Sequence, residues 1–269
     1  MPGLKNLLNG VLRFRATVRK DLVKQFEKVR NNPQPAAIFF TCMDSRILPA
    51  RFVQAQVGDM FVVRNSANLI PNAVNYENQV TTEPAALELA IKRGGIQHVI
   101  VCGHSDCKAI NTLYNLHKNP ESFDASSPMD NWLRKHGYRS VAKLVRMMEK
   151  SKSEDPNERK LQFFAEDPQL LNFTAYIDPN NEFGIEDRLS QINALQQIVH
   201  IASHGFIQDY MLKGELYLHV LWFDVYKGDM HMFSRAKERF VLIDENSVDE
   251  LEAEARGNYA NSRVATAQR

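Results

Sequence analysis

The chain has 269 residues, and its 33 lysines and arginines nearly balance its 32 aspartates and glutamates. A net charge of +1 with 44% hydrophobic residues is typical of an ordinary soluble protein, and it does not favour nucleic acid or an acidic membrane surface as a partner. No apolar run approaches the roughly 18 to 20 residues that are needed to cross a bilayer. The sequence therefore predicts no membrane span.

The cysteines indicate the redox environment. There are three of them, Cys42, Cys102 and Cys107, and an odd number does not favour a disulfide framework. The amino terminus also lacks the apolar segment of a secretory signal. We therefore expect an intracellular protein, in the cytoplasm or the mitochondrial matrix, and not a secreted one.

Residues 1–31 are predicted to form an amphipathic helical arm. Apolar residues recur at helical spacing from Leu4 to Val29, among many lysines and arginines. The same composition is compatible with a mitochondrial transit peptide. We favour a packed structural helix over a removed peptide, and a targeting role without removal stays open.

Strands and helices alternate after the arm. Strands are predicted at Ala36–Thr41, Asp59–Arg64, His98–Cys102, Glu215–Tyr226 and Met230–Ser234. Helices are predicted at Ile47–Gln56, from an N-cap at Thr82 to Gly94-Gly95, and at Cys107–His117, Asn131–Lys150, Asn157–Glu166 and Ile185–Ser203. This alternation favours an α/β fold with a mostly parallel central β-sheet flanked by helices. We expect one domain over residues 1–269, with a flexible tail at about 252–269.

Reactive side chains follow two of the predicted strands. Residues 42–46 read Cys-Met-Asp-Ser-Arg, and residues 104–107 read His-Ser-Asp-Cys. Because the carboxyl ends of parallel strands meet at one edge of a sheet, we expect the two segments to converge. Two thiolates and an imidazole suit zinc, and three protein ligands leave the fourth tetrahedral position open, as in a catalytic site.

These motifs resemble those of a known family. The matching segments are Cys42-x-Asp44-x-Arg46, His104-x-x-Cys107, the Arg64-Asn65 segment with Asn68, the helix beginning Glu83-Pro84, and, late in the chain, Gly214-Glu215-Leu216. Together they resemble the β-class carbonic anhydrases, continuously from about Lys20 to Ile110 and more weakly from Gln191 to Asp244. The segment Cys107-Lys108-Ala109 is similar to the animal-type branch.

The resemblance implies an activity and a cofactor. It implies one Zn²⁺ per chain, bound by Cys42, His104 and Cys107. It also implies reversible hydration of carbon dioxide to bicarbonate and a proton, by attack of zinc-bound hydroxide. Members of the family fold an amino-terminal arm over a partner subunit, so a homodimer or a multiple of dimers is expected.

Asp44 and Arg46 are the candidate catalytic pair. Two thiolates neutralise the zinc charge, so the bound water should be harder to deprotonate than on a three-histidine zinc, and a nearby acceptor would help. Asp44 is a candidate for that acceptor, with Arg46 keeping it oriented and ionised. Two other interpretations stay open: a structural salt bridge, and Asp44 occupying the fourth zinc position.

The substrate pocket is less well defined by the sequence. Carbon dioxide is small and apolar, so apolar side chains should line its pocket. By resemblance the candidates are Phe61, Ala67, Leu89 and, with a one-residue shift, Gln34. Cys102 is expected to be an inert core residue, and the candidates for proton transfer are His117, His136 and Tyr76.

Two other functions compete with carbon dioxide hydration. One is a zinc hydrolase on the same scaffold that acts on a sulfur analogue of carbon dioxide. The other is a non-catalytic binding protein stabilised by zinc, which would need a closed fourth position. An assay on both substrates would separate the first, and metal analysis with a hydration assay would separate the second.

Overall fold

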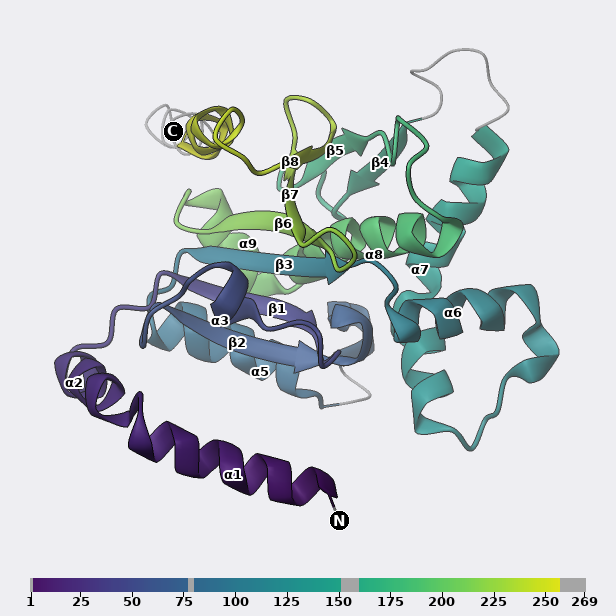
Figure 1. The fold of residues 1–269 in the computed structure, drawn as a ribbon. Coiled ribbons are helices and arrows are strands. Elements are labelled where there is room, and N and C mark those ends of the chain that lie inside the picture. The colour runs from purple at the N-terminus through teal and green to yellow at the C-terminus, as the bar shows by residue number, and fades with distance from the viewer. Residues whose placement is uncertain (1, 77–79, 151–159, 257–269) are drawn as a thin grey trace.

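The computed structural model describes residues 2–76, 80–150 and 160–256, and a six-stranded sheet lies at the centre of this part of the chain (Figure 1). The strand order is β2-β1-β3-β6-β7-β8; the first four strands are parallel, and β7 and β8 are antiparallel to their neighbours. The bounds are Met60–Asn65 (β2), Ala37–Cys42 (β1), His98–His104 (β3), Tyr217–Asp224 (β6), Asp229–Ser234 (β7) and Arg239–Leu242 (β8). The predicted α/β class with a mostly parallel sheet is confirmed.

The five predicted strands are all present, each within two residues of its predicted bounds. The shift that matters most is at β3, which continues to His104 instead of ending at Cys102. His104, one of the candidate metal ligands, is therefore part of the strand itself. Strand β8 was not predicted.

A second, two-stranded sheet corrects one prediction. Residues Asn157–Glu166 were predicted as a helix, but Leu161–Phe164 is strand β4, which pairs with β5 at Asn172–Ala175. Residues 157–159 lie outside the described residues. The burial along β4 alternates, and Phe163 stacks on Phe173 of β5 with ring centroids 5.1 Å apart. Pairing with a segment further along the chain overrode the local helical pattern.

The helices surround the sheet. They are α1 (Pro2–Ala16), α2 (Arg19–Val29), α3 (Pro49–Phe52), α4 (Ala73–Tyr76), α5 (Thr82–Glu88) with a π-helical turn at Leu89–Arg93, α6 (Lys108–Lys118), α7 (Pro128–Lys150), α8 (Ile185–Ala202) and α9 (Gly205–Leu212). Short 3₁₀ turns lie at Ser66–Asn68 and Pro120–Ser122. Residues 248–256 are also helical, so helix extends into the tail that was expected from about Glu252; residues 257–269 lie outside the described residues.

Several helix boundaries differ from the predictions, and α7, for example, begins at Pro128 instead of Asn131. The helix predicted at Ile47–Gln56 is only Pro49–Phe52, because Gln54 has a φ of 49° and a left-handed residue cannot continue a right-handed helix. The N-cap of α5 is Thr81 and not Thr82, which is already the first helical residue.

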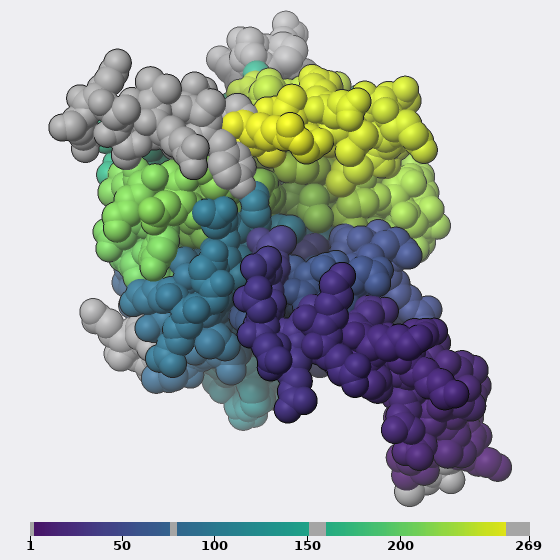
Figure 2. Space-filling view, turned by 90° about the vertical axis from the view of Figure 1, so that its left-hand side faces the viewer, coloured from purple at the N-terminus to yellow at the C-terminus, as the bar shows by residue number. Residues whose placement is uncertain are grey.

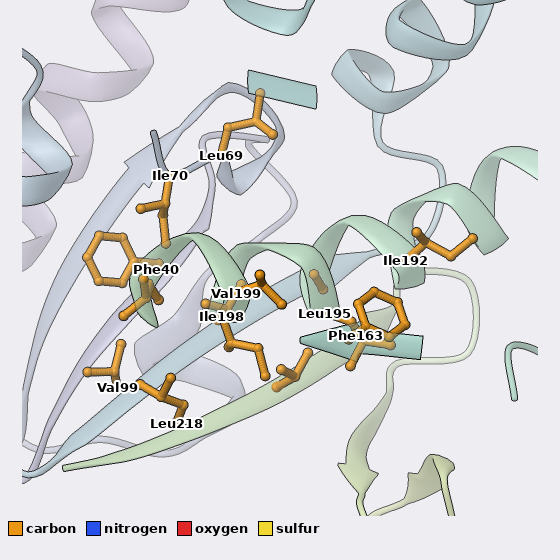
Figure 3. Close-up of a cluster of buried hydrophobic side chains, with 14 of the residues drawn as sticks. Phe40, Leu69, Ile70, Val99, Phe163, Ile192, Leu195, Ile198, Val199 and Leu218 are labelled. Carbon is orange, nitrogen blue, oxygen red and sulfur yellow. The ribbon is translucent and has the colours of Figure 1, made fainter. Parts of the chain in front are cut away.

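Helix α8 positions the segment next to the candidate site. It packs over β3 and β6, where Ile192, Leu195, Ile198 and Val199 join Val99 and Leu218 in the core (Figure 3). Several of its polar residues are buried as well, and Asn193 and Gln197 bond to the loop after β2. Asn193 Nδ2 donates to Ala67 O at 2.9 Å, and Gln197 Oε1 accepts from Ile70 N at 2.7 Å. Hydrogen bonds from buried side chains of α8 thus hold this loop in place.

The amino-terminal arm is two helices instead of one. They meet at Thr17, whose hydroxyl donates back to Arg13 O at 2.7 Å. Helix α1 projects away from the sheet (Figures 1 and 2). Its apolar side chains are exposed: Leu4, Leu7, Leu8, Val11, Leu12 and Phe14. In the described ranges, no helix is both long and apolar enough to cross a membrane.

Candidate metal centre

The two motifs meet at one edge of the sheet. Cys42 is the last residue of β1, His104 is the last residue of β3, and Cys107 is the N-cap of α6. Strands β1 and β3 are adjacent and parallel, so their carboxyl ends lie together. One ligand atom from each of the three residues lies within 4.8 Å of the other two, and all three residues are buried.

The spacing of the sulfur atoms fits a tetrahedral zinc ion. Sγ of Cys42 and Sγ of Cys107 are 3.8 Å apart. Two zinc–sulfur bonds of about 2.3 Å, meeting at the tetrahedral angle, place the sulfurs about 3.8 Å apart. The backbone therefore already holds the thiols at the separation that the metal requires.

His104 presents one ring nitrogen to the same point. Its Nδ1 lies 2.8 Å from Ser105 O, and since a carbonyl can only accept, Nδ1 carries the proton. The lone pair is then on Nε2, which is buried and has no hydrogen-bond partner. A buried, unpartnered Nε2 with its Nδ1–H bonded to a carbonyl is the arrangement of a metal-binding histidine.

Cys42 Sγ and Cys107 Sγ form a hydrogen bond through a proton on one of the two sulfurs, and this contact shifts their pKa values in opposite directions. The pKa of Cys42 is lowered, first because it is hydrogen-bonded by Cys107, and further by His104. The pKa of Cys107 is raised well above its usual range by the same pairing and by burial. A divalent cation would replace that proton and stabilise both thiolates. Cys102 differs, because burial raises its pKa and its Sγ faces Gly103 O, as expected of a core residue.

Neighbouring elements hold the His104 loop. Ser190 Oγ of α8 donates to His104 O at 2.7 Å, and Trp222 Nε1 of β6 donates to Ser190 Oγ at 3.1 Å. Ser105 Oγ donates to Asp224 Oδ1 at 3.1 Å. These partners come from residues far along the chain, and their positions were not predicted. The backbone around the imidazole is thus fixed from two sides.

Asp44 and Arg46 form a close ion pair beside the candidate ligands. Arg46 Nε donates to Asp44 Oδ1 at 3.0 Å and Arg46 Nη2 donates to Asp44 Oδ2 at 2.7 Å, so the pairing is bidentate. The hydrogen bonds from Arg46 hold the pKa of the Asp44 carboxyl below its usual range. The pKa of Arg46 is raised by Asp44 and then by Asp106.

Two further charged residues contact this pair, and sequence reasoning gave neither a role. Arg64 of β2 donates from Nε to Cys42 O at 3.1 Å and from Nη2 to Asp44 O at 2.7 Å, which holds the loop after β1. Asp106, between His104 and Cys107, contacts Arg46. Asp106 lies inside the motif His104-x-x-Cys107, and this position is the feature of the sequence that could have indicated a role for it.

The four residues predicted to line the substrate pocket do not all lie near Cys42 and Cys107 of the same chain. Ala67 is buried in the turn beside the end of β1 and has a φ of 65°, a strained value for alanine. Phe61, which pairs with Ile38 in the first half of β1, is 37% exposed, and Gln34 is exposed before the opposite end of β1. Leu89 is 52% exposed. A single chain thus brings Ala67 to the end of the sheet that carries the candidate ligands, and it places Phe61 and Gln34 away from that end.

The candidates for proton transfer differ in exposure. His117 is exposed at the end of α6. His136 is buried in α7 with both ring nitrogens unpartnered, and burial, assisted by Lys135, lowers its pKa to about 4. A group with that pKa is a weak proton acceptor at neutral pH. The side chain of Tyr76 lies outside the described residues.

Comparisons with known proteins agree with the geometry. The sequence profile of the family described as carbonic anhydrase matches residues 37–230. The chain is 54% identical to β carbonic anhydrase 1 of Caenorhabditis elegans over 95% of this chain and 94% of that protein.

Solved structures share the fold. The β-carbonic anhydrase CcaA matches with a TM-score of 0.70 and 24% identity, over 91% of this chain and 94% of that one. Two tetrameric β-carbonic anhydrases of Sordaria macrospora give a structure that matches with a TM-score of 0.60 and 19% identity, over 87% and 98% of the two chains. Since the profile, the relative and the sheet edge that carries two thiols and an imidazole all agree, this chain belongs to the β-class carbonic anhydrases.

Proposed function

We propose that this carbonic anhydrase hydrates carbon dioxide reversibly with one zinc ion per chain, bound by Cys42, His104 and Cys107. The observation that carries the proposal is the buried cluster itself, with thiols 3.8 Å apart and an imidazole nitrogen that has no other partner. When bound, zinc supplies an activated water as nucleophile and a Lewis acid for the substrate oxygen. Three protein ligands leave room for that chemistry.

Asp44 is the proposed acceptor beside the metal position. A carboxylate only accepts hydrogen bonds when it is ionised, so it can hold the proton of the nucleophile away from carbon dioxide and direct a lone pair toward the substrate. Arg46 keeps it ionised, as the lowered pKa of Asp44 indicates. Both Asp44 oxygens accept hydrogen bonds from Arg46. This pairing supports a state in which Asp44 stays with Arg46 and leaves the fourth metal position open.

We also propose a homodimer, or a multiple of dimers, as the assembled form. The apolar side chains of α1 are exposed in the single chain, as are Phe61 and Val62 on β2, the edge strand of the sheet. Apolar surface of this kind favours association. A second copy that covers this surface would bury Phe61, one of the candidate pocket residues. The tetrameric relatives of Sordaria macrospora support self-association.

A reducing compartment suits the proposed site. Cys42, Cys102 and Cys107 are all free thiols. Thiolate ligands must stay reduced to bind zinc, which fits the cytoplasm or the mitochondrial matrix.

Metal analysis and a stopped-flow hydration assay test the proposal. We expect about one zinc per chain, and loss of zinc and activity in Cys42→Ser, His104→Ala and Cys107→Ser. Cys102→Ala, outside the cluster, should keep both and serves as the matched control. A zinc-free protein with full activity would contradict the proposal. Hydrolysis of a sulfur analogue of carbon dioxide in place of hydration would favour the competing enzyme function.

A further inference from the structure

Arg46 lies between two carboxylates that come from the two different motifs. The edge of the guanidinium formed by Nε and Nη2 binds Asp44, two residues away. At the adjacent edge, Nη1 donates to Asp106 Oδ2 at 2.9 Å and Nη2 donates to Asp106 O at 2.9 Å. Asp106 is 60 residues away in sequence, between the metal-ligand candidates His104 and Cys107. Arg46 therefore joins the loop after β1 to the loop after β3.

Asp106 is itself held in place from three directions. Its backbone N donates to Asp187 Oδ1 of α8 at 2.7 Å. Its Oδ1 accepts from Lys108 Nζ at 2.7 Å and from Asn111 Nδ2 at 3.4 Å. Its φ of 50° is uncommon for a residue with a side chain and persists only where the surroundings fix it. The carboxylate is thus a rigid partner for Arg46.

We infer that Asp106 is a positioning residue, which clamps the Arg46 guanidinium so that Asp44 is presented to the metal position in one orientation. The inference rests on the proposed function and extends it to a residue with no assigned role. A guanidinium is planar with its donors in a fixed fork, so partners on two adjacent edges, with Nη2 donating to both residues, determine both its place and its plane. Without the Asp106 carboxylate, Arg46 would keep its bonds to Asp44 and to the backbone carbonyl of residue 106, but Nη1 would lose its partner and the guanidinium could rotate together with Asp44.

An ordinary surface salt bridge is the competing interpretation. Such pairs contribute little because solvent screens them and both side chains remain mobile. Here the carboxylates are mostly covered, with side-chain exposures of 13% for Asp44 and 19% for Asp106. Arg46 also bonds to a backbone carbonyl of the loop, which cannot swing away. Charges alternate in sign from Asp44 through Arg46 and Asp106 to Lys108, so the clamp carries no net charge.

Two substitutions test the clamp without disturbing the backbone. Glycine and asparagine both tolerate a left-handed φ, so Asp106→Gly removes the side chain and Asp106→Asn keeps one acceptor in the same conformation. The control is Asp209→Asn, an exposed carboxylate on α9 outside the site. We expect all variants to keep about one zinc per chain. Asp106→Gly should lower kcat about tenfold with KM within about twofold, and asparagine should restore part of the loss.

A second readout does not depend on activity. The visible spectrum of the cobalt(II)-substituted protein reports the ligands and geometry at the metal. It should change in Asp106→Gly, because a released Asp44 alters the fourth position, and it should not change in Asp209→Asn. A kcat within twofold of wild type together with an unchanged cobalt spectrum would overturn the inference, and so would loss of zinc from Asp106→Gly. A wild-type protein with no hydration activity would instead refute the proposed function. The cobalt spectrum would still test whether Asp106 holds Arg46 in place.

Discussion

The same hydrogen bonds from Arg46 fix the orientation of the Asp44 carboxylate and keep it ionised. Hydrogen bonds from Arg46 hold the Asp44 pKa below its usual range, so the carboxylate is ionised at every pH near neutrality. Any change of activity between pH 7 and 9 must therefore come from another group. Under the proposed function we predict that this group is the activated water, because two thiolate ligands would make it less acidic than on a three-histidine zinc, where its pKa is about 7.

Substitution of the pair should separate catalysis from metal binding. We expect Asp44→Asn to retain zinc and to lower the hydration rate about 100-fold, because an amide can donate where an acceptor is required. Arg46→Ala should act similarly by freeing the carboxylate, and Arg46→Lys should not restore the rate because it cannot bind Asp44 bidentately. Wild-type activity should rise toward alkaline pH. If either Asp44→Asn or Arg46→Ala stays within about twofold of wild type from pH 7 to 9, the pair is only a structural salt bridge.

Buried imidazoles should make the stability depend on pH. Burial lowers the pKa of His136 from 6.5 to about 4, so the unfolded chain binds a proton below pH 6.5 that the folded chain refuses. Stability that is present above pH 6.5 is thus lost as the pH falls toward 4. We expect His136→Gln to flatten this dependence in urea unfolding measured at several pH values. The exposed His117→Gln should not, and equal slopes for the two variants would contradict the assignment.

At the scale of the elements, the contact between α6 and α7 depends on one glycine. A Cβ on Gly137 of α7 would lie 2.5 Å from Cδ2 of Leu113 on α6, which is closer than atoms can approach. Leu113 is buried, so it has little room to move. The two helices therefore meet at this position only because a side chain is absent. Since α6 starts at Cys107, this contact also supports the candidate metal centre.

Alanine substitutions test that contact. Gly137→Ala should lower the free energy of unfolding by about 1 to 3 kcal/mol, because the core must shift to accept the methyl group. Gly205→Ala is the matched control in another helix. Its Cβ would meet nothing within 4 Å, so it should leave stability unchanged or raise it by about 0.4 to 1 kcal/mol. Urea unfolding of both variants measures the difference, and equal effects would show that the contact is not tight.

At the scale of the whole molecule, the amino-terminal arm stands out because the apolar side chains of α1 stay exposed in a single chain. Helix α1 extends from the body (Figure 2), and Leu7 is 71% exposed. Packing against a second copy would remove that apolar face from water, and burial of apolar surface lowers the free energy of the assembly. The sheet edge at β2 offers a further surface for the same partner.

Association should depend on the apolar face of the arm. Leu7→Asp should weaken self-association at least tenfold in analytical ultracentrifugation, because it places a charge in the proposed interface. Asn6→Asp adds the same charge to the same helix at a polar residue and should change association little. Removal of residues 1–31 should also yield monomers. A fully dimeric and stable truncation would show that the arm is not the interface.

Much of this protein was determined by its sequence alone. The α/β class, the five main strands and the β-class family all followed from periodicity and from motifs a few residues long. Cys42, His104 and Cys107 could be proposed as ligands because parallel strands bring their carboxyl ends to one edge. Their convergence agrees with that reasoning, and their role as zinc ligands stays a prediction.

Only the tertiary structure decided the contacts between distant segments. Strand β4 forms because β5 offers a partner, although the local pattern indicated a helix. The clamp between Arg46 and Asp106 depends on a left-handed residue between two ligand candidates and on a hydrogen bond from α8. Local propensity and spacing act within a few residues along the chain. Strand pairing and side-chain contacts are set by which surfaces the completed fold brings together, and short patterns do not carry that information.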